Sequence, residues 1–322
     1  MKVGVWFQPT TDAHTVARRV VDAEQHGFDF VGITDGQMIW RDVYACLALA
    51  AARTERVRLG PWVTNPVTRH ITATANSICT LDELSGGRAF VGIGVGDDSV
   101  HTIGRQPATI DSLASDVDVL GRLMSGEAVE HGDHTWRLAT GHEPRPPIYW
   151  AAAGPRSLRT AAQATDGVVH SGWLDPDLMR EAHASMDEGE SERPPGSTSV
   201  ARIFNTAVAI SHDREEALNW AAPYAARAFI YPASSRVPGW DEEKRQALIK
   251  EYDYYGHFGA AQTAKVPREL ISRKAVVGTP EEATALLSSV AEAGYTHAAL
   301  IVMGDVDNVM RHLAESVLPH LA

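Results

Sequence analysis

The chain has 322 residues, of which 44% are hydrophobic, and this length is enough to enclose one large core. Its 29 Lys and Arg residues stand against 41 Asp and Glu residues, which gives a net charge of -12 at pH 7. Such a charge repels nucleic acid and anionic membrane surfaces at long range, so we expect neither as a partner.

The two cysteines, Cys46 and Cys79, lie in apolar helical patterns, which indicates core packing and not a disulfide framework. No segment approaches the roughly 18 consecutive apolar residues of a membrane helix, and the N-terminus enters a strand at once. A cytoplasmic protein is therefore expected. His131 and His134 flank a turn without a further convergent ligand, so we predict no metal site.

Eight apolar runs alternate with helical patterns along the chain. Because the first four periods contain no antiparallel hairpin, they favour right-handed crossovers and a parallel sheet. Eight strands close such a sheet, so we predict an α/β fold, a (β/α)8 TIM barrel, as a single domain over residues 1–322. An open doubly wound sheet is the alternative. The expected strands are Val3–Phe7, Phe28–Ile33, Val57–Val63, Ala89–Val95, Pro147–Ala152, Gly167–Ser171, Val200–Ile210 and His297–Val302.

Two segments depart from this alternation. Residues 127–138, with Gly132 and Asp133 at their centre, are typical of a surface hairpin. Residues 231–276 contain three prolines, a Tyr-rich patch at 252–255 and little periodicity. We interpret this second segment as an insertion over the C-terminal mouth of the barrel.

Reactive groups of a parallel barrel lie at the carboxyl ends of its strands. The stretch GIGVGD, residues 92–97, follows the fourth strand and lacks the spacing of a dinucleotide-binding loop. Its glycines would let a flat ring approach the backbone, and tight packing at a barrel corner is the alternative. Asp97 could exchange a proton beside such a ring. Asp35, after the second strand, could accept hydrogen bonds there or cap a helix.

The segment from Arg56 to Gly96 contains GPWVTNPVTRH and then TLDELSGGR before the glycine-rich strand. These motifs resemble the luciferase-like superfamily, and most closely its deazaflavin-dependent branch of methylenetetrahydromethanopterin reductase type. Weaker matches at AEQHGFDFVGITD, YWAAAGPRSLRTAAQATDGVV and VGTPEEATALLSSVAEAGYTHAAL extend the resemblance over nearly the whole chain. Ile71 departs from the pattern, because the family often has proline after the Arg-His pair.

The resemblance implies that a cofactor ring lies at the barrel mouth, against a non-prolyl cis peptide that joins Trp62 and Val63. Binding of the phosphate and tail would fall to the turn 153–156 and to residues 170–172, where helix amides are free. The cofactor-binding residues expected on this basis are Asp35, Trp62, Val63, Thr64, Asn65, Gly94, Gly96, Asp97, Ala153, Gly154, Pro155, Arg156, His170, Ser171 and Gly172.

Deazaflavin sugar-phosphate dehydrogenases of this family have an Asp-His motif after strand two, a nearby Trp and a Glu after strand four. This sequence is similar in having Asp35 and Trp40, but it has Gly36 in place of the histidine and Asp97 in place of the Glu. The shorter acid agrees better with the reductase-like branch. The catalytic residues that the resemblance implies are Asp97, Asp35 and Trp40.

Coenzyme F420 is the cofactor expected from the resemblance. The expected reaction is hydride transfer between it and a C=C, C=O or C=N bond of a small organic substrate. One alternative is an FMN-dependent monooxygenase that uses oxygen and reduced flavin, and another is a non-catalytic flavin-binding homologue. The resemblance also implies a homodimer, and a flavin or F420 reductase as a partner. The sequence does not identify the substrate.

Overall fold

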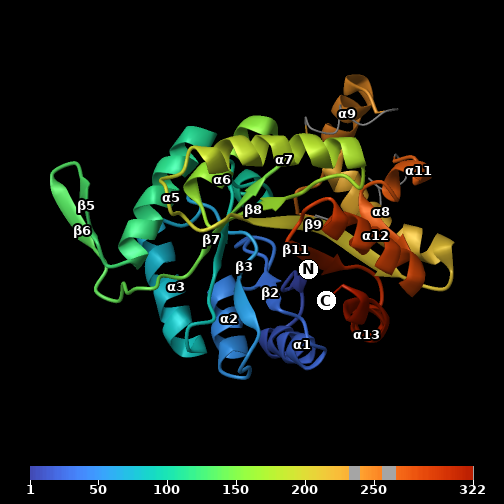
Figure 1. The fold of residues 1–322 in the computed structure, drawn as a ribbon, viewed down its shortest axis with the longest axis horizontal. Helices are drawn as coiled ribbons and strands as arrows, with labels where there is room; N and C mark the ends of the chain where they lie inside the picture. Colours follow the sequence, from blue (N-terminus) through green and yellow to red (C-terminus); the bar gives the residue numbers. More distant parts are fainter. Residues whose placement is uncertain (232–239, 256–265, 322) are drawn as a thin grey trace.

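The protein is a barrel of parallel strands surrounded by helices (Figure 1). The structure, a computed structural model, describes residues 1–231, 240–255 and 266–321. The predicted (β/α)8 barrel is confirmed, and no barrel strand extends more than one residue beyond the segment predicted for it. The eight strands are β1 (Lys2–Phe7), β2 (Phe30–Ile33), β3 (Arg58–Pro61), β4 (Val91–Ile93), β7 (Ile148–Ala152), β8 (Gly167–His170), β9 (Ala201–Ile210) and β11 (His297–Val302).

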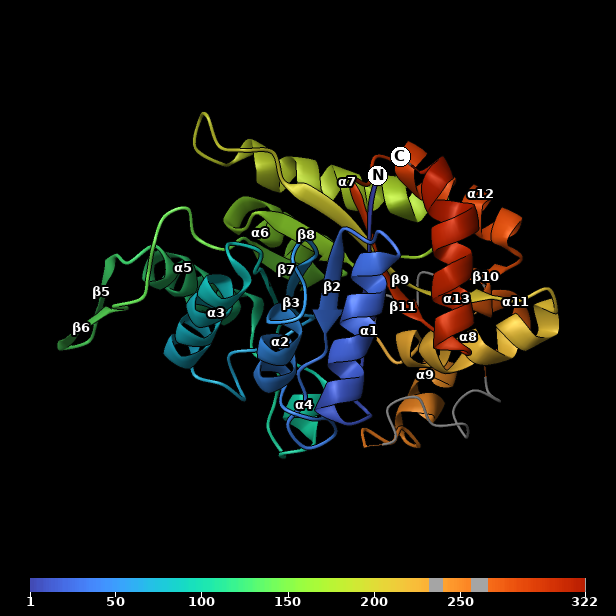
Figure 2. The ribbon, with the colours of Figure 1, turned by 90° about the horizontal axis from the view of Figure 1, so that it is seen from below.

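The strands are hydrogen-bonded in the order β3-β2-β1-β11-β9-β8-β7-β4. Parallel bridges from Leu59 to Ala89 and from Thr64 to Ile93 join the β3 and β4 segments, so the sheet closes on itself. The first residue and the last described residue lie close together at one end of the molecule, where the Met1 amino group donates to the Leu321 carbonyl oxygen across 2.6 Å (Figure 2).

Helices cover the outside of the barrel, and most of them begin at a side chain that accepts a backbone N–H. Asp12, Asp42, Thr109, Asp175 and Asp213 serve as such caps. None of the helices in the described part of the chain is long and apolar enough to cross a membrane. The helices are α1 (Ala13–Gln25), α2 (Val43–Ala51), α3 (Ile71–Ser85), α4 (Asp98–His101), α5 (Ile110–Met124), α6 (Pro155–Ala164), α7 (Pro176–Ser191), α8 (Arg214–Ala228), α9 (Glu242–Ile249), α11 (Arg268–Ile271), α12 (Pro280–Glu292) and α13 (Val306–His312), followed by the turns Leu313–Val317 and Leu318–His320.

Strand β10 (Ala275–Gly278) is a structural element that the sequence did not indicate. We expected the segment 231–276 to be an insertion over the barrel mouth, yet its last two residues begin a strand that pairs in parallel with β9. Ala207 of β9 pairs with Ile301 on one side and with Ala275 on the other. Strand β10 therefore lies on the β8 side of β9 and continues the barrel wall beyond the end of β8.

A hairpin of β5 (Ala128–His131) and β6 (His134–Arg137) projects from the barrel at the position expected for a surface hairpin (Figure 1). Gly132 takes the positive φ of 57° that its turn requires. The His131 ring stacks on Trp136 with 3.8 Å between the ring centroids. In the described ranges, no three His, Cys, Asp or Glu side chains lie close enough together to hold a metal ion.

Aromatic side chains fill the barrel interior, and glycines on neighbouring strands make room for them. A Cβ atom on Gly32 would lie 2.4 Å from the Cβ of Trp62, and one on Gly60 would lie 2.1 Å from the carbonyl oxygen of Phe90. The Trp62 ring lies 5.7 Å from both the Phe30 and the Phe90 ring. Because this interior is packed, we expect chemistry at the carboxyl ends of the strands.

Candidate functional site

Asp97 follows β4 at the barrel mouth and is held by groups from α8 and the residues after it. The guanidinium of Arg227 and the hydroxyl of Tyr231 both donate to the Asp97 carboxylate. The same guanidinium lies 3.4 Å from the carboxylate of Asp98, and His101 Nε2 lies 3.9 Å from Asp97 Oδ1. The predicted catalytic acid therefore lies in a cluster of opposite and like charges.

The proton affinity of Asp97 is set by competing effects. Burial raises its pKa to about 6, the positive charge of Arg227 opposes this, and the neighbouring carboxylate of Asp98 adds to it. A carboxyl group with such a pKa can hold a proton or release it near neutral pH. That property suits a group that exchanges a proton with a substrate.

The Tyr-rich patch lies against the helix that follows Asp97. The Tyr254 ring lies 4.5 Å from the ring of His101, and the Tyr255 hydroxyl donates to the Thr102 carbonyl oxygen across 3.0 Å. Tyr252 is buried among the apolar side chains of the barrel interior. These contacts support the interpretation of 240–255 as part of an insertion over the mouth; residues 232–239 and 256–265 lie outside the described part.

Asp35 is a second buried acid at the mouth, with 8% of its surface exposed. Thr64 donates its hydroxyl to Asp35 Oδ2 across 2.7 Å, and Arg69 Nε lies 4.0 Å from the same oxygen. Burial raises the Asp35 pKa, and these two neighbours oppose the shift. Asp42, and not Asp35, caps the following helix α2, so the capping alternative for Asp35 is wrong.

Trp40 lies beside Gly36 at the end of the second strand. A Cβ atom on Gly36 would lie 2.6 Å from the Trp40 ring, so the indole occupies the space that a histidine at position 36 would need. Trp40 can therefore hold this position because residue 36 is glycine and not the histidine of the sugar-phosphate dehydrogenases.

Asn65 and Ser99 join the loops that follow β2, β3 and β4. Asn65 Nδ2 donates to Ser99 Oγ across 3.0 Å, and Gln37 Nε2 donates to the Ser99 carbonyl oxygen across 2.8 Å. Asn65 Oδ1 accepts the backbone N–H groups of Val67 and Thr68. The side-chain amide of Asn65, which we predicted to bind the cofactor, thus holds the loops at the barrel mouth in place.

The peptide bond between Trp62 and Val63 is cis, as the resemblance implied. Its side chains lie against the glycines of the fourth strand. A Cβ atom on Gly92 would lie 2.6 Å from the Pro61 carbonyl oxygen, and one on Gly94 would lie 3.3 Å from Val63. Close packing of β3 on β4 therefore accounts for Gly92, which agrees with the alternative considered for this stretch.

Gly96 has a different role from Gly92. Its φ of 93° lies in the left-handed region, and a Cβ atom there would lie 2.4 Å from Val100. Gly96 thus turns the chain sharply before Asp97, and the turn directs the acid toward α8.

The two segments predicted to bind a phosphate and tail come together at one small cavity. Ala153, Pro155, His170 and Trp173 line it, together with side chains of α7. Gly154, the first residue of the α6 turn, donates its N–H to Ser157 Oγ. The topology thus brings the ends of β7 and β8 to a common site.

Two residues of these segments are engaged elsewhere. Arg156 is exposed and forms an ion pair with Asp111 of α5 at 2.6 Å. His170 is buried, with Nδ1 2.5 Å from the Tyr295 hydroxyl. Burial lowers the His170 pKa to about 3, and the charge of Lys274 adds to this effect, so the imidazole is neutral at physiological pH.

A polar chain that the sequence did not indicate crosses the barrel interior. Trp62 Nε1 donates to Asn205 Oδ1 across 3.0 Å, and Asn205 Nδ2 donates to Ser171 Oγ across 3.1 Å. Asn205 lies in the middle of a long, mostly apolar strand, and the polar pair Asn205–Thr206 in such a strand is the signal that could have identified it. These hydrogen bonds connect the end of β3 to the loop that follows β8.

Two buried donors at the end of β1 have no acceptor among the residues described. They are Trp6 Nε1 and Gln8 Nε2, and the Trp6 side chain packs inside the barrel with Trp62. Buried donors without acceptors are costly, and a ligand that carries carbonyl or ring-nitrogen acceptors would satisfy them. The donor set at the mouth thus fits the polar edge of a flavin or deazaflavin ring.

Fold and site together define a barrel enzyme whose titratable acid and unsatisfied donors gather at the C-terminal mouth. The family model described as luciferase-like monooxygenase matches residues 1–297. The chain belongs to this family.

Individual relatives cover almost the whole chain. A 5,10-methylenetetrahydromethanopterin reductase of Methanolobus tindarius is 30% identical in an alignment 314 residues long, which covers 92% of this chain and 92% of the relative. An F420-dependent glucose-6-phosphate dehydrogenase of Microbacterium testaceum is 26% identical and covers 93% of this chain and 90% of its own. The solved structure of the coenzyme F420-dependent tetrahydromethanopterin reductase of Methanopyrus kandleri superposes with a TM-score of 0.83 at 24% identity, covering 100% of this chain and 99% of its own.

Proposed function

We propose that this protein is an oxidoreductase that uses coenzyme F420 and transfers a hydride to or from a small organic substrate. The observation that carries the proposal is Asp97, an acid with a pKa of about 6 at the barrel mouth, held by Arg227 and Tyr231. Relatives that are similar over more than nine-tenths of the chain act on pterin or sugar-phosphate substrates, which supports this class of reaction.

The residues present fit a deazaflavin. Val63 and Gly94 would form the wall behind the ring, and Trp6 and Gln8 would donate to its polar edge. The loops 153–155 and 170–172 would hold its tail. When bound, the deazaflavin supplies or accepts the hydride.

The chain's own acids would handle the proton that accompanies the hydride. In the direction of reduction, a protonated Asp97 donates to the nitrogen or oxygen of the substrate double bond, and in the reverse direction it accepts that proton. Asp35, held by Thr64, would orient the substrate or the ring by accepting hydrogen bonds. Trp40, packed on Gly36, would form an aromatic side of the substrate pocket.

The second candidate function is an FMN-dependent monooxygenase, which the name of the matching family favours. Anaerobic titration of the purified protein with F420 and with FMN, followed by fluorescence, distinguishes the two. We expect F420 to bind more tightly. Tighter binding of FMN, with oxygen consumed when reduced flavin is added, would replace the first proposal by the second.

We also propose that the protein is a cytoplasmic homodimer and that a separate reductase supplies its reduced cofactor. Sedimentation of the purified protein at several concentrations tests the dimer. Sedimentation as a monomer at all of them would remove the dimer from the proposal without affecting the hydride chemistry.

A further inference from the structure

Lys274 is a buried lysine just before β10, with 3% of its surface exposed. Its Nζ donates to the carbonyl oxygens of Ser171 and Gly172, across 2.8 Å and 2.5 Å. The rings of Trp173 and Tyr224 lie 5.1 Å and 5.9 Å from the same nitrogen. The ammonium group therefore lies directly behind the loop that follows β8.

No carboxylate neutralises this charge within the described ranges. The nearby acid Asp175 is paired with Arg273 at 2.6 Å. Residues 232–239 and 256–265 contain neither Asp nor Glu in their sequence. A buried ammonium without a counter-ion is unfavourable, and carbonyl groups and aromatic faces compensate only part of the lost hydration.

The contacts of Lys274 also orient two peptide groups. In a trans peptide the N–H points opposite to the C=O. The N–H groups of Gly172 and Trp173 therefore point away from Lys274, and in the described part of the chain neither donates to a backbone acceptor. A Cβ atom on Gly172 would lie 2.5 Å from the His170 ring, so only glycine fits here.

We propose that Lys274 is the buried counter-charge of the cofactor phosphate, and that binding of this anion at the Ser171–Gly172 loop is coupled to uptake of a proton by Lys274. This inference rests on the proposed use of F420, whose tail contains a phosphodiester. The two amide groups would donate to the phosphate oxygens from one side while the ammonium polarises the same peptides from the other.

The proton linkage follows from the burial of Lys274. Burial lowers its pKa to about 7, so in the protein without cofactor a large part of Lys274 is neutral at physiological pH. An anion nearby stabilises the charged form and raises that pKa, so binding takes up a proton. The affinity of the protein for the cofactor is then highest below pH 7 and decreases as the pH rises above 7.

Other titratable groups around Lys274 do not change charge over this range. His170 on β8 stays neutral because its pKa is about 3, and burial raises the pKa of Tyr224 on α8 further above the range. Arg273, next in the chain, is paired with Asp175. On strand β9, the residue next to Lys274 is Thr206, which does not ionise in this range. Its hydroxyl donates to the Lys274 carbonyl oxygen.

The test is the pH dependence of binding of F420 and of FO, the deazaflavin chromophore that lacks the phosphate but has the same ring. For the wild type we expect the dissociation constant of F420 to rise about tenfold from pH 7 to pH 8.5, and that of FO to change much less. Calorimetry in buffers of different ionisation enthalpy should show uptake of about half a proton at pH 7, and nearly one at pH 8, on binding of F420.

Three variants complete the test. Lys274→Met should bind F420 weakly at every pH, and Lys274→Arg, whose charge persists, should bind it tightly without the pH dependence. Lys2→Met is the matched control, because Lys2 is exposed at the opposite end of the barrel, and it should behave as wild type. If the Lys274 variants do not fold, the proton uptake of the wild type alone decides the question.

The outcomes distinguish a failure of the role of Lys274 from a failure of the proposed use of F420. Tight F420 binding without proton uptake, or an equal pH dependence for F420 and FO, would overturn the role of Lys274 and leave the proposed function intact. Failure of both F420 and FO to bind at any pH would overturn the proposed function together with this inference.

Discussion

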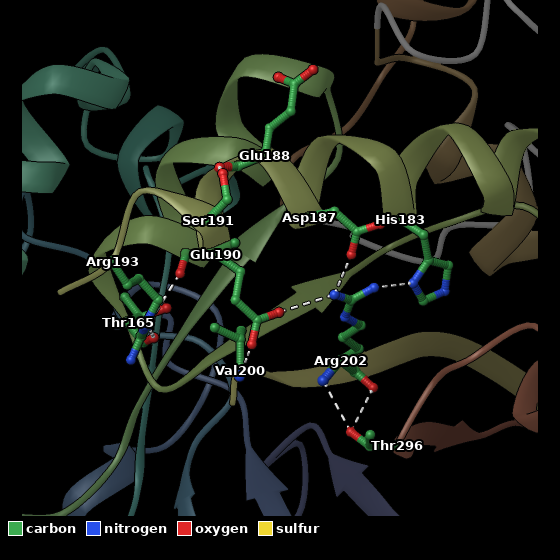
Figure 3. Close-up of polar contacts among 11 residues, drawn as sticks. Thr165, His183, Asp187, Glu188, Glu190, Ser191, Arg193, Val200, Arg202 and Thr296 are labelled. Atoms are coloured by element: carbon green, nitrogen blue, oxygen red, sulfur yellow. Dashed lines mark hydrogen bonds and ion pairs between the residues drawn. The ribbon is translucent and has the colours of Figure 1, made fainter. Parts of the chain in front are cut away.

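Two arginines, one at each end of the barrel, each contact two carboxylates, and a histidine belongs to each cluster. At the amino end, Arg202 extends from the start of β9 to three side chains of α7 (Figure 3). It lies 2.8 Å from His183 Nδ1, 2.5 Å from Asp187 Oδ1 and 3.0 Å from Glu190 Oε2. Glu190 also accepts the backbone N–H of Val200. This cluster fastens a helix to the base of a strand.

At the carboxyl end, Arg227 contacts Asp97 and Asp98 while His101 lies beside Asp97. Like the base, the mouth combines an arginine, two carboxylates and a histidine, but Tyr231 also donates to Asp97 and the two acids together are less exposed. The side chains of Asp97 and Asp98 are 26% and 4% exposed, whereas those of Asp187 and Glu190 are 62% and 28% exposed. Water stabilises the charge of the acids at the base, and its partial exclusion at the mouth raises the pKa of Asp97.

The same residue types thus stabilise structure at one end of the barrel and adjust the proton affinity of an acid at the other. Burial at the mouth and the adjacent carboxylate of Asp98 make the difference, since both raise the pKa of Asp97. This agrees with the division of labour in parallel barrels, whose amino ends serve stability and whose carboxyl ends serve chemistry.

The largest effect is expected for Asp97→Asn. The variant keeps the size of the side chain but cannot donate the proton of a carboxylic acid, so turnover should fall about 10²- to 10⁴-fold. In the wild type, the rate of reduction should fall about tenfold per pH unit above pH 6, because the protonated acid is required. In the variant this decrease of the rate above pH 6 should be absent. Oxidation of reduced F420 with an imine or carbonyl substrate found by screening measures both.

Asp187→Asn in the amino-end cluster is the matched control for turnover and should leave it unchanged. An Asp97→Asn enzyme with wild-type turnover and an unchanged pH profile would remove Asp97 from the chemistry.

A smaller effect, on stability alone, is expected for Arg202→Met. The change leaves His183, Asp187 and Glu190 without their shared partner, and we expect it to cost about 2 kcal/mol in the free energy of unfolding. Urea unfolding measures this loss. Turnover at low temperature should stay within twofold of wild type; a large loss of turnover in folded protein would contradict the separation of the two ends.

The smallest effect is expected for Asp187→Asn itself. Because this carboxylate is mostly exposed, its ion pair with Arg202 is screened by water, and Glu190 remains as a partner. We expect a loss of about 0.5 kcal/mol or less, measured by the same urea unfolding. A loss as large as that of Arg202→Met would show that exposure does not weaken this pair.

The barrel could be predicted from the sequence because each strand is a short apolar run with a local signal. His297–Val302 has the predicted boundaries, and β9 differs from its prediction by one residue. Strand β10 could not be predicted, because Ala275–Gly278 is only four residues long and follows a stretch without periodicity. Its pairing depends on β9, which lies far away in the sequence.

The site was predicted in part for the same reason. Asp35 and Asp97 follow predicted strands, so their place at the mouth follows from the topology. Arg227 and Lys274 carry no such signal, because each lies outside the strand ends and reaches the mouth only through the fold. Arg156 was expected to bind a phosphate, and its partner Asp111 could not be foreseen from a separation of 45 residues along the chain.

The pairing of glycine with an aromatic ring inside the barrel limits how this protein can change over evolution. Trp62 can keep its place only while residue 32 has no side chain, and the same holds for Phe90 and Gly60. Enlarging either glycine alone forces a ring or a strand to move, and shrinking either ring alone opens a void. New specificities should therefore arise by paired substitutions inside the barrel or, with fewer steps, by changes in the loops at its mouth.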